Sequence, residues 1–410
     1  MIRRTLALIG SLIASQASAQ SLLHSASTER VNVVLLGDSN QLYAGHGWDH
    51  GWAKALDTTF GTYATGIHWL GENFGAGNGV GYQCNTTANL GAGVFYYDGW
   101  ANDPADPSAA GLRPCNTISL LSGNALFTVG MTLHANSPVY GAGDTLRGDV
   151  WLRTLGPGAS VRPQFRLGAP PYTVLAQTGF ISHVSSDLQQ YTLTFSPSTN
   201  SNALDFRIGS QTFAPYQAYF SRITNTSKDS GVSVSTLYGY GGQSARDLAV
   251  TLRDLPDGWL INYFDTLKQQ GNKIVIRVCM GLNDRVETLP SIKHGYPSTS
   301  MEAYYDNMSY ITGNLIDALE NGTIPGEYEI ILTTPQPVST PNNLQLESYI
   351  SILSNKLVRE HVRVFNLTSV TSHAEMLANG WYVNPGDTNH LSLPGYEQLS
   401  RREIDAILAQ

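Results

Sequence analysis

The chain has 410 residues, enough for two domains, and a formal net charge of −8 at pH 7. Only 14% of its residues are charged and the charges are dispersed, so the sequence offers no basic surface for nucleic acid or an anionic membrane. We therefore exclude both as partners and expect a neutral or small substrate. The 40 glycines, 21 tyrosines and 7 tryptophans are typical of a β-rich extracellular protein.

The first 19 residues have the pattern of a secretory signal. Arg3 and Arg4 are followed by an apolar stretch from Leu6 to Ala14 and by the small residues Ala17-Ser18-Ala19. This pattern predicts cleavage near Ala19, and the apolar stretch is too short to span a membrane. The alternative is a disordered or buried N-terminal segment. We expect a secreted protein, periplasmic or extracellular, without membrane insertion.

An apolar run, Val33 to Leu36, leads directly into Gly37-Asp38-Ser39-Asn40. A buried strand that ends in this way presents a serine hydroxyl at the rim of a sheet, where it can act as a nucleophile. The same residue types also form ordinary turns, so Gly-Asp-Ser alone does not indicate an enzyme.

Aromatic and histidine residues gather soon afterwards, in the segment 46–52. His46, Asp49 and His50 could in principle ligate a metal, but this spacing is common on helices without one, and we predict no metal site and no cofactor. Trp48 could stack on a sugar, while packing in the core is the ordinary role for it. Asp38, Trp48 and Asp284 are candidate substrate contacts.

From about Gly75 to Asp229 the helical periodicity disappears. Short alternating runs at 146–152, 161–167, 191–195 and 204–208 are separated by Gly, Pro, Asn and Ser clusters, which predicts an all-β sandwich or jelly roll over residues 76–229. Cys84 and Cys115 both lie in Gly/Asn/Pro-rich sequence of this region, and because export favours disulfides we expect them to pair; the alternative is that both are unpaired. Cys279 lies inside an apolar run and is expected to be a buried free thiol.

The C-terminal part alternates between strand and helix. Strands are predicted at 31–36, 232–237, 274–280, 328–333 and 362–367, and helices at about 301–319, 344–360 and 394–408. This alternation predicts crossover connections and a parallel sheet covered by helices on both faces. The α/β domain would consist of residues 20–75 and 230–410, with the β domain inserted into it.

Three further motifs supply what a serine nucleophile needs. Asp387 and His390 are three residues apart before the last helix, so one turn of chain can bring the carboxylate to Nδ1 of the imidazole. Asn283 follows a predicted strand at the ligand-binding edge of the sheet. Its amide, the backbone N–H of Gly242 and the N–H of Ser39 could donate to an oxyanion. Each motif alone would be read as a turn or cap.

The four motifs together resemble those of the SGNH, or GDSL-type, hydrolases. Gly37-Asp38-Ser39 resembles the first block, Gly242 the second, Gly281-Leu282-Asn283-Asp284 the third and Asp387 to His390 the last. The resemblance covers about 22–75 and 230–410, and it implies a flavodoxin-like α/β/α sandwich. The chain differs in having Asn40 where the common spelling has Leu, and in the long interval between Ser39 and Gly242, which holds the β domain.

The sequence therefore predicts a secreted serine esterase without a cofactor. We expect Ser39, Asp387 and His390 to be catalytic, and Ser39, Gly242 and Asn283 to form the oxyanion hole. The inserted domain resembles the carbohydrate-binding-like domains of polysaccharide esterases, which favours an acetylated polysaccharide or glycan as the substrate. Two alternatives stay open, a lipolytic or aryl esterase with the β domain as a lid or scaffold, and an inactive carbohydrate-binding protein.

Overall fold

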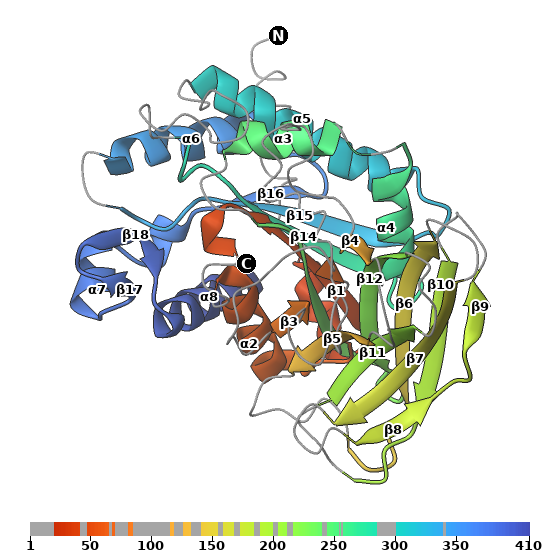
Figure 1. Cartoon of the computed structure of the whole chain (residues 1–410). Coiled ribbons are helices and arrows are strands. Elements are labelled where there is room, and N and C mark those ends of the chain that lie inside the picture. Colours follow the sequence, from red (N-terminus) through yellow and green to blue (C-terminus); the bar gives the residue numbers. More distant parts are fainter. Residues whose placement is uncertain are drawn as a thin grey trace.

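The structure of the chain is a computed structural model (Figure 1). It describes residues 20–41, 47–64, 68–69, 81–84, 115–118, 126–132, 141–154, 159–167, 173–183, 189–199, 204–210, 216–239, 244–253, 255, 257–284, 301–338 and 342–410. The predicted signal segment, His46, Gly241 and Gly242 lie outside these residues. In the described part, no helix is both long and apolar enough to cross a bilayer.

Five parallel strands form the central sheet. They are β1 (Arg30–Gly37), β13 (Gly231–Gly239), β14 (Lys273–Cys279), β15 (Glu327–Thr333) and β16 (Val362–Phe365), in the spatial order β13-β1-β14-β15-β16. By position along the chain this is the order 2-1-3-4-5, which is that of flavodoxin-like sheets. The parallel sheet predicted from the alternation of strands and helices is confirmed.

Helices cover the sheet on both sides (Figure 1). One face carries α3 (Ala245–Arg253), α4 (Trp259–Lys268), α5 (Met301–Glu320) and α6 (Asn342–Lys356). The other carries the 3₁₀ helix η1 (Leu22–Ser27), α2 (Trp48–Phe60), α7 (His373–Ala378) and α8 (Leu393–Leu408). Ser392 caps α8 through a hydrogen bond from the N–H of Gly395, and Pro394 stands in its first turn, as helix-start preferences predict.

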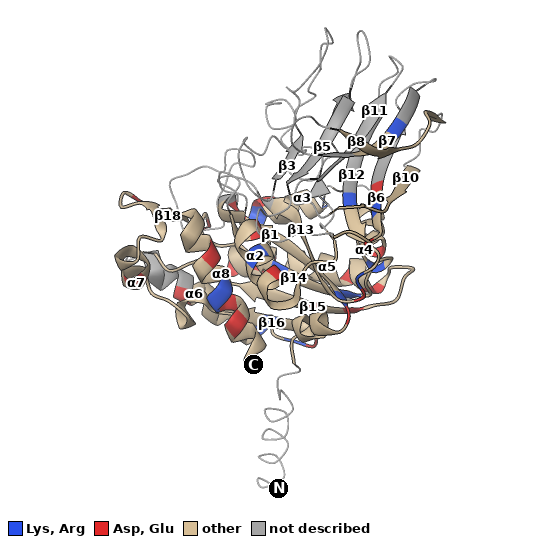
Figure 2. Cartoon of the chain, turned by 90° about the horizontal axis from the view of Figure 1, so that it is seen from below, with Lys and Arg blue, Asp and Glu red and all other residues tan. Residues whose placement is uncertain are grey.

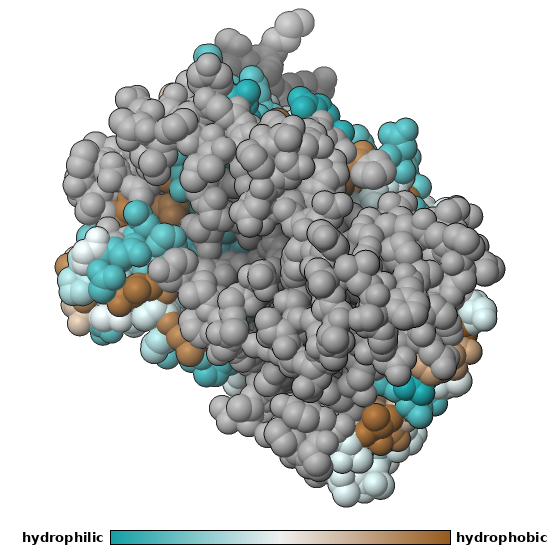
Figure 3. All heavy atoms as spheres, in the orientation of Figure 1, coloured by the Kyte–Doolittle hydropathy of each residue, from teal (hydrophilic) through white to brown (hydrophobic). Residues whose placement is uncertain are grey.

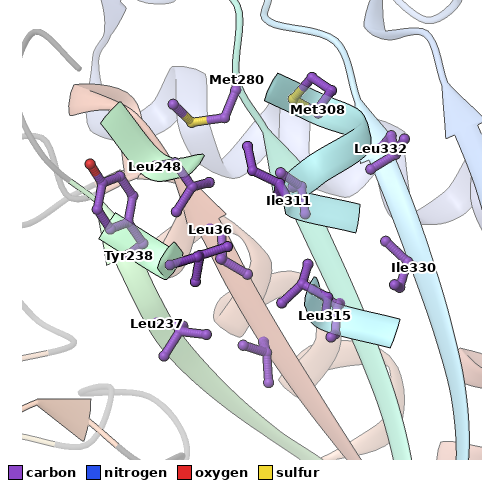
Figure 4. Packing of buried hydrophobic residues seen from close by; sticks show 14 of the residues in the cluster. Leu36, Leu237, Tyr238, Leu248, Met280, Met308, Ile311, Leu315, Ile330 and Leu332 are labelled. Atoms are coloured by element: carbon purple, nitrogen blue, oxygen red, sulfur yellow. The ribbon is translucent and has the colours of Figure 1, made fainter. Parts of the chain in front are cut away.

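Successive residues of β1 enter different cores. Val34 and Leu36 pack with α3, α4 and α5, whereas Val33 and Leu35 pack with α2 and α8. Figure 4 shows the first of these cores, where Leu36 lies among Leu248 and Ile311 from the covering helices. A strand buried on both faces needs apolar residues on both sides, which explains the continuous apolar run from Val33 to Leu36 in the sequence.

Antiparallel strands fill much of the region between β1 and β13. One sheet has the order β10-β6-β12-β2, with β4 also paired to β12, and the other has the order β3-β5-β11-β7-β8, with β9 paired to β7. The bounds are β2 (His68–Trp69), β3 (Gly81–Cys84), β4 (Cys115–Ile118), β5 (Leu126–Thr132), β6 (Leu146–Thr154), β7 (Ala159–Leu167), β8 (Val174–Gln177), β9 (Ile181–His183), β10 (Gln189–Phe195), β11 (Leu204–Ser210) and β12 (Tyr216–Asn225).

The two antiparallel sheets meet through aromatic packing. The ring of buried Phe165 on β7 lies 5.7 Å from that of Phe195 on β10, centroid to centroid. The all-β character predicted for this region is found in its described strands, while its boundaries at 76 and 229 stay predictions. β2 precedes residue 76 and yet pairs with β12, so antiparallel pairing begins earlier in the chain than we expected.

The cysteines give a mixed result. Cys279 is buried with a free thiol, as predicted. The expected Cys84–Cys115 bridge gains no support and stays a prediction, because both side chains lie outside the part that the structure describes; their backbones belong to β3 and β4, strands of different sheets.

Candidate active site

The expected motifs converge because the strands that carry them are neighbours. Gly37, the last residue of β1, is in register with Gly239 at the end of β13 and with Cys279 at the end of β14. The segments that follow these residues contain Ser39, Gly242 and Asn283, respectively. They therefore leave the same edge of the sheet, at the point where the strand order reverses and open α/β sheets bind ligands.

Ser39 opens the 3₁₀ helix η2 (Ser39–Gln41), directly after β1. The turn is held by buried Asp38, whose Oδ1 accepts hydrogen bonds from the backbone N–H of Asn40 at 2.9 Å and from its Nδ2 at 3.3 Å. Gly47, just before α2, lies so close that an added Cβ would stand 2.3 Å from the carbonyl oxygens of Asn40 and Gln41. Only glycine lets α2 approach the serine turn this closely.

Asp387 and His390 form the contact that their spacing predicted. Nδ1 of His390 lies 3.0 Å from Oδ2 of Asp387, and Oδ1 of Asp387 also accepts from the backbone N–H groups of Asn389 and His390. Partial burial acts to raise the pKa of Asp387, but the hydrogen bonds from His390 and Asn389 outweigh it, and the pKa is lowered. The carboxylate is therefore ionised and oriented at neutral pH.

The predicted loop around this pair is a short hairpin. β17 (Tyr382–Asn384) pairs with β18 (Asp387–Leu391), and Oδ1 of Asn384 accepts from the N–H groups of Gly386 and Asp387. The Asn-Pro-Gly-Asp sequence signalled a turn, but two very short strands give no periodicity to read.

The hairpin is joined to the serine turn. Nε2 of Gln336 donates to Oδ1 of Asn40 at 3.3 Å and also to the carbonyl of Asn389, and the hydroxyl of Tyr396 donates to the same Oδ1 at 2.6 Å. Burial raises the pKa of Asp38, although the hydrogen bonds from Asn40 act to lower it. The two hydrogen bonds of Gln336 join the first and last motifs.

The turn that carries Asn283 has its own supports. Gly281 has a φ of +128°, a conformation that requires glycine. The hydroxyls of Tyr304 and Tyr349, whose rings stack 4.0 Å apart, donate to the carbonyls of Met280 and Asp284, on either side of Asn283. These tyrosines come from α5 and α6, and nothing local in the sequence linked them to the motif.

Asp284 links this turn to the start of α3. Its two carboxylate oxygens accept from the backbone N–H of Ala245, at 3.1 and 3.0 Å. A carboxylate at a helix N-terminus interacts favourably with the helix dipole. Asp284 therefore ties the start of α3 to the Asn283 turn.

The three candidate substrate contacts are all buried, which for Trp48 agrees with the core packing given above as its ordinary role. Asp38 is 3% exposed, Trp48 is 1% exposed and Asp284 is fully buried. Asp38 and Asp284 hold backbone turns, as described above, while the Trp48 ring packs edge-on against Tyr396 and over the Arg277 guanidinium. These positions support the site from behind and offer a ligand almost no surface.

A buried ion pair beneath the site was missed by the sequence analysis. Nε and Nη2 of Arg277 on β14 donate to the two oxygens of Glu403 on α8, at 2.9 and 3.0 Å, and both side chains are fully buried. Burial acts to lower the pKa of Arg277, but Glu403 outweighs it and the pKa is raised. The only sequence signal is an arginine inside an otherwise apolar strand.

The residues considered for metal or cysteine chemistry have other surroundings where the structure describes them, while His46 lies outside the described residues. The described part of the chain contains no group of three or more His, Cys, Asp and Glu side chains suited to a metal ion. His50 instead contacts Glu397, with Nε2 2.9 Å from Oε1, and Lys54 contacts the same oxygen. Burial raises the pKa of the Cys279 thiol to about 12, which keeps it protonated and unreactive.

No family model matches the chain, and no curated protein matches it either. Among solved structures, it is similar to a family two carbohydrate esterase from Cellvibrio japonicus, with 12% identity over 70% of this chain and 99% of that chain and a TM-score of 0.28. A family two carbohydrate esterase from Clostridium thermocellum in complex with cellohexaose has 10% identity over 65% of this chain and 92% of that chain, with a TM-score of 0.26. A carbohydrate acetylesterase family member from Sinorhizobium meliloti has 14% identity over 44% of this chain and 81% of that chain, with a TM-score of 0.25. All three TM-scores are below 0.5, so these likenesses do not establish a shared fold.

Proposed function

We propose that the protein is a serine esterase of the SGNH type, with Ser39, His390 and Asp387 as the catalytic residues. One observation carries the proposal, the Asp387–His390 pair held by Gln336 against the turn that contains Ser39. A serine next to a histidine that is itself oriented by a carboxylate is the arrangement that acyl transfer requires.

The proposed reaction follows from these roles. Nε2 of His390 takes the proton of the Ser39 hydroxyl as its oxygen attacks the ester carbonyl, and Asp387 stabilises the imidazolium that results. The N–H groups of Ser39 and Gly242 and the amide of Asn283 donate to the oxyanion. His390 then gives its proton to the departing alcohol. Water, deprotonated by His390, attacks the acyl-enzyme and releases the acid and free Ser39.

For the substrate we propose an O-acetylated polysaccharide or glycan. Two features support a neutral sugar polymer over an anionic partner. Antiparallel sheets occupy the insertion between β1 and β13, the region that resembles the carbohydrate-binding-like domains of polysaccharide esterases. Over the described surface, acidic and basic residues are interspersed, for example along α8 (Figure 2). We propose that the protein acts after export, outside the cytoplasm.

A lipolytic or aryl esterase remains the second candidate, because a nucleophile of this kind does not select its acyl group. The described residues visible on the face in Figure 3 mix hydrophilic and hydrophobic side chains. Large exposed apolar side chains of the described part, such as Leu377 and Val383, lie on or near the hairpin that carries His390.

The two candidates are separated by comparing p-nitrophenyl esters of two to twelve carbons with acetylated polysaccharides, using acetate release as the readout for the latter. The proposal predicts activity that falls steeply beyond short acyl chains, together with acetate release from a polymer. A preference for long chains without acetate release from any polymer would favour the lipolytic enzyme. No hydrolysis of any ester would contradict both.

A further inference from the structure

A continuous chain of hydrogen bonds runs from the residue before Ser39 to the residue before His390. Asp38 accepts from the side-chain amide of Asn40, and Oδ1 of Asn40 accepts from Gln336 and Tyr396. The same Gln336 nitrogen donates to the carbonyl of Asn389. The four residues whose side chains make these hydrogen bonds are almost inaccessible to solvent: Asp38 is 3% exposed, Asn40 1%, Gln336 1% and Tyr396 0%.

These hydrogen bonds connect two elements that belong to different sheets. Ser39 follows β1 in the middle of the parallel sheet, whereas His390 lies on β18, which belongs to a separate two-stranded hairpin. Gln336 comes from a third place, the segment after β15. Its amide nitrogen carries two hydrogens, so it can donate to the serine turn and to the histidine hairpin at the same time.

The residue type at position 40 fits this arrangement. The common SGNH spelling has Leu after the serine, and this chain has Asn40. A leucine there would remove the buried acceptor that the Tyr396 hydroxyl and one hydrogen of the Gln336 amide share, which is costly. Asn40 therefore has a structural role that leucine could not fill, because its amide oxygen accepts hydrogen bonds from both Gln336 and Tyr396.

We propose that Gln336 and Asn40 are positioning residues that fix His390 relative to Ser39. The inference rests on the proposed function, since it assigns these two residues a role in the same site. Neither residue needs to contact the substrate for this role. A displacement of a catalytic group by about 1 Å can cost about 100-fold in rate, so losing the bridge should lower kcat and leave KM nearly unchanged.

The first test is Gln336→Met, which keeps the length of the side chain and removes the amide. With p-nitrophenyl acetate we expect kcat to fall about 10- to 100-fold and KM to change less than about threefold. Gln164→Met on β7 is the matched control. Gln164 is also 1% exposed and donates from Nε2 to Gln177, far from Ser39 in the fold, so this variant should keep its kcat even where its melting temperature falls.

The second test is a double-mutant cycle of Gln336→Met and Asn40→Leu. If both act through their shared hydrogen bond, the double variant loses less than the product of the two single losses. Multiplicative losses, or a Gln336→Met variant with the kcat of the wild type, would overturn the inference. Asn40→Leu alone, tested for the same split between kcat and KM, decides the question if Gln336→Met does not fold.

Ser39→Ala, measured in parallel, separates this inference from the proposed function. Retained activity in Ser39→Ala would refute the proposed function itself. An inactive Ser39→Ala variant, together with an unaffected kcat in both positioning variants, would refute only the positioning role.

Discussion

Replacing Glu403 by glutamine should destabilise the protein strongly while keeping the shape of the side chain. Four hydrogen bonds end on this carboxylate. Oε1 accepts from Nε of Arg277 and from Oγ1 of Thr333, and Oε2 accepts from Nη2 of Arg277 and Nε1 of Trp52. An amide offers one oxygen, so in either orientation two of these donors face an NH₂ group.

The magnitude follows from these contacts. Two buried donors left unsatisfied cost about 1–3 kcal/mol each. Breaking a buried ion pair by removing one partner costs about 3–5 kcal/mol, because the remaining charge is uncompensated. The two estimates describe the same event and overlap near 4 kcal/mol. Since proteins are stable by about 5–15 kcal/mol, the Glu403→Gln variant should still fold.

Urea unfolding followed by tryptophan fluorescence measures the loss, because Trp48 and Trp52 lie against Arg277. Asp405→Asn is the matched control on the same helix. Its exposed pair with Arg401 is worth only about 0.3–0.5 kcal/mol. Adding Arg277→Met to Glu403→Gln should recover part of the stability, since the unpaired charge is removed. A Glu403→Gln variant as stable as Asp405→Asn would refute this reasoning.

Three further predictions concern single residues near the site. Burial raises the pKa of Asp49 to about 7, whereas an aspartate in the unfolded chain has a pKa of about 3.9. The folded protein therefore binds this proton more tightly than the unfolded chain does. As a result, the stability of the wild type falls as the pH rises from about 4 to about 7. The gain in unfolding free energy from Asp49→Asn, measured by urea unfolding at several pH values, should therefore grow from about pH 4 to about pH 7; a gain independent of pH would contradict the raised pKa. Gly47→Ala should lower both melting temperature and activity, because the added Cβ would stand 2.3 Å from two backbone carbonyl oxygens. Gly313→Ala is the control and should lower neither, because no atom lies within 4 Å of its added Cβ. Equal effects of the two substitutions would exclude the close approach at Gly47 as the cause. Asn283→Ala should lower kcat about 100- to 1,000-fold on p-nitrophenyl acetate with little change in KM, as expected for an oxyanion donor, while a raised KM with unchanged kcat would make Asn283 a ground-state binding residue.

Local sequence pattern was enough to predict most of the α/β architecture. β14, β15 and α5 lie within a residue or so of their predicted bounds, because long apolar runs mark the two strands and apolar residues at helical spacing mark α5. α6 ends at Lys356 and not at Glu360, since the chain turns between Arg359 and Val362, which exchange backbone hydrogen bonds. Such a turn has no strong composition signal.

The site was predictable where the chemistry is local. Asp387 and His390 are three residues apart, so their contact could be read from spacing. Gln336, Glu403 and the Tyr304–Tyr349 pair act across hundreds or tens of residues, and only the packing of β15, α8, α5 and α6 around the sheet edge brings them to the motifs. The burial of Trp48 and Asp284 has the same origin, because exposure depends on which elements pack against a residue.

Labelling with a fluorophosphonate, followed by mapping of the modified peptide by mass spectrometry, tests the central claim most directly. The reagent reacts with a serine whose hydroxyl is activated by a base, so the account predicts modification of Ser39, slower modification in His390→Ala and none in Ser39→Ala, with esterase activity lost in step. Modification of a different serine, or full activity in Ser39→Ala, would contradict it.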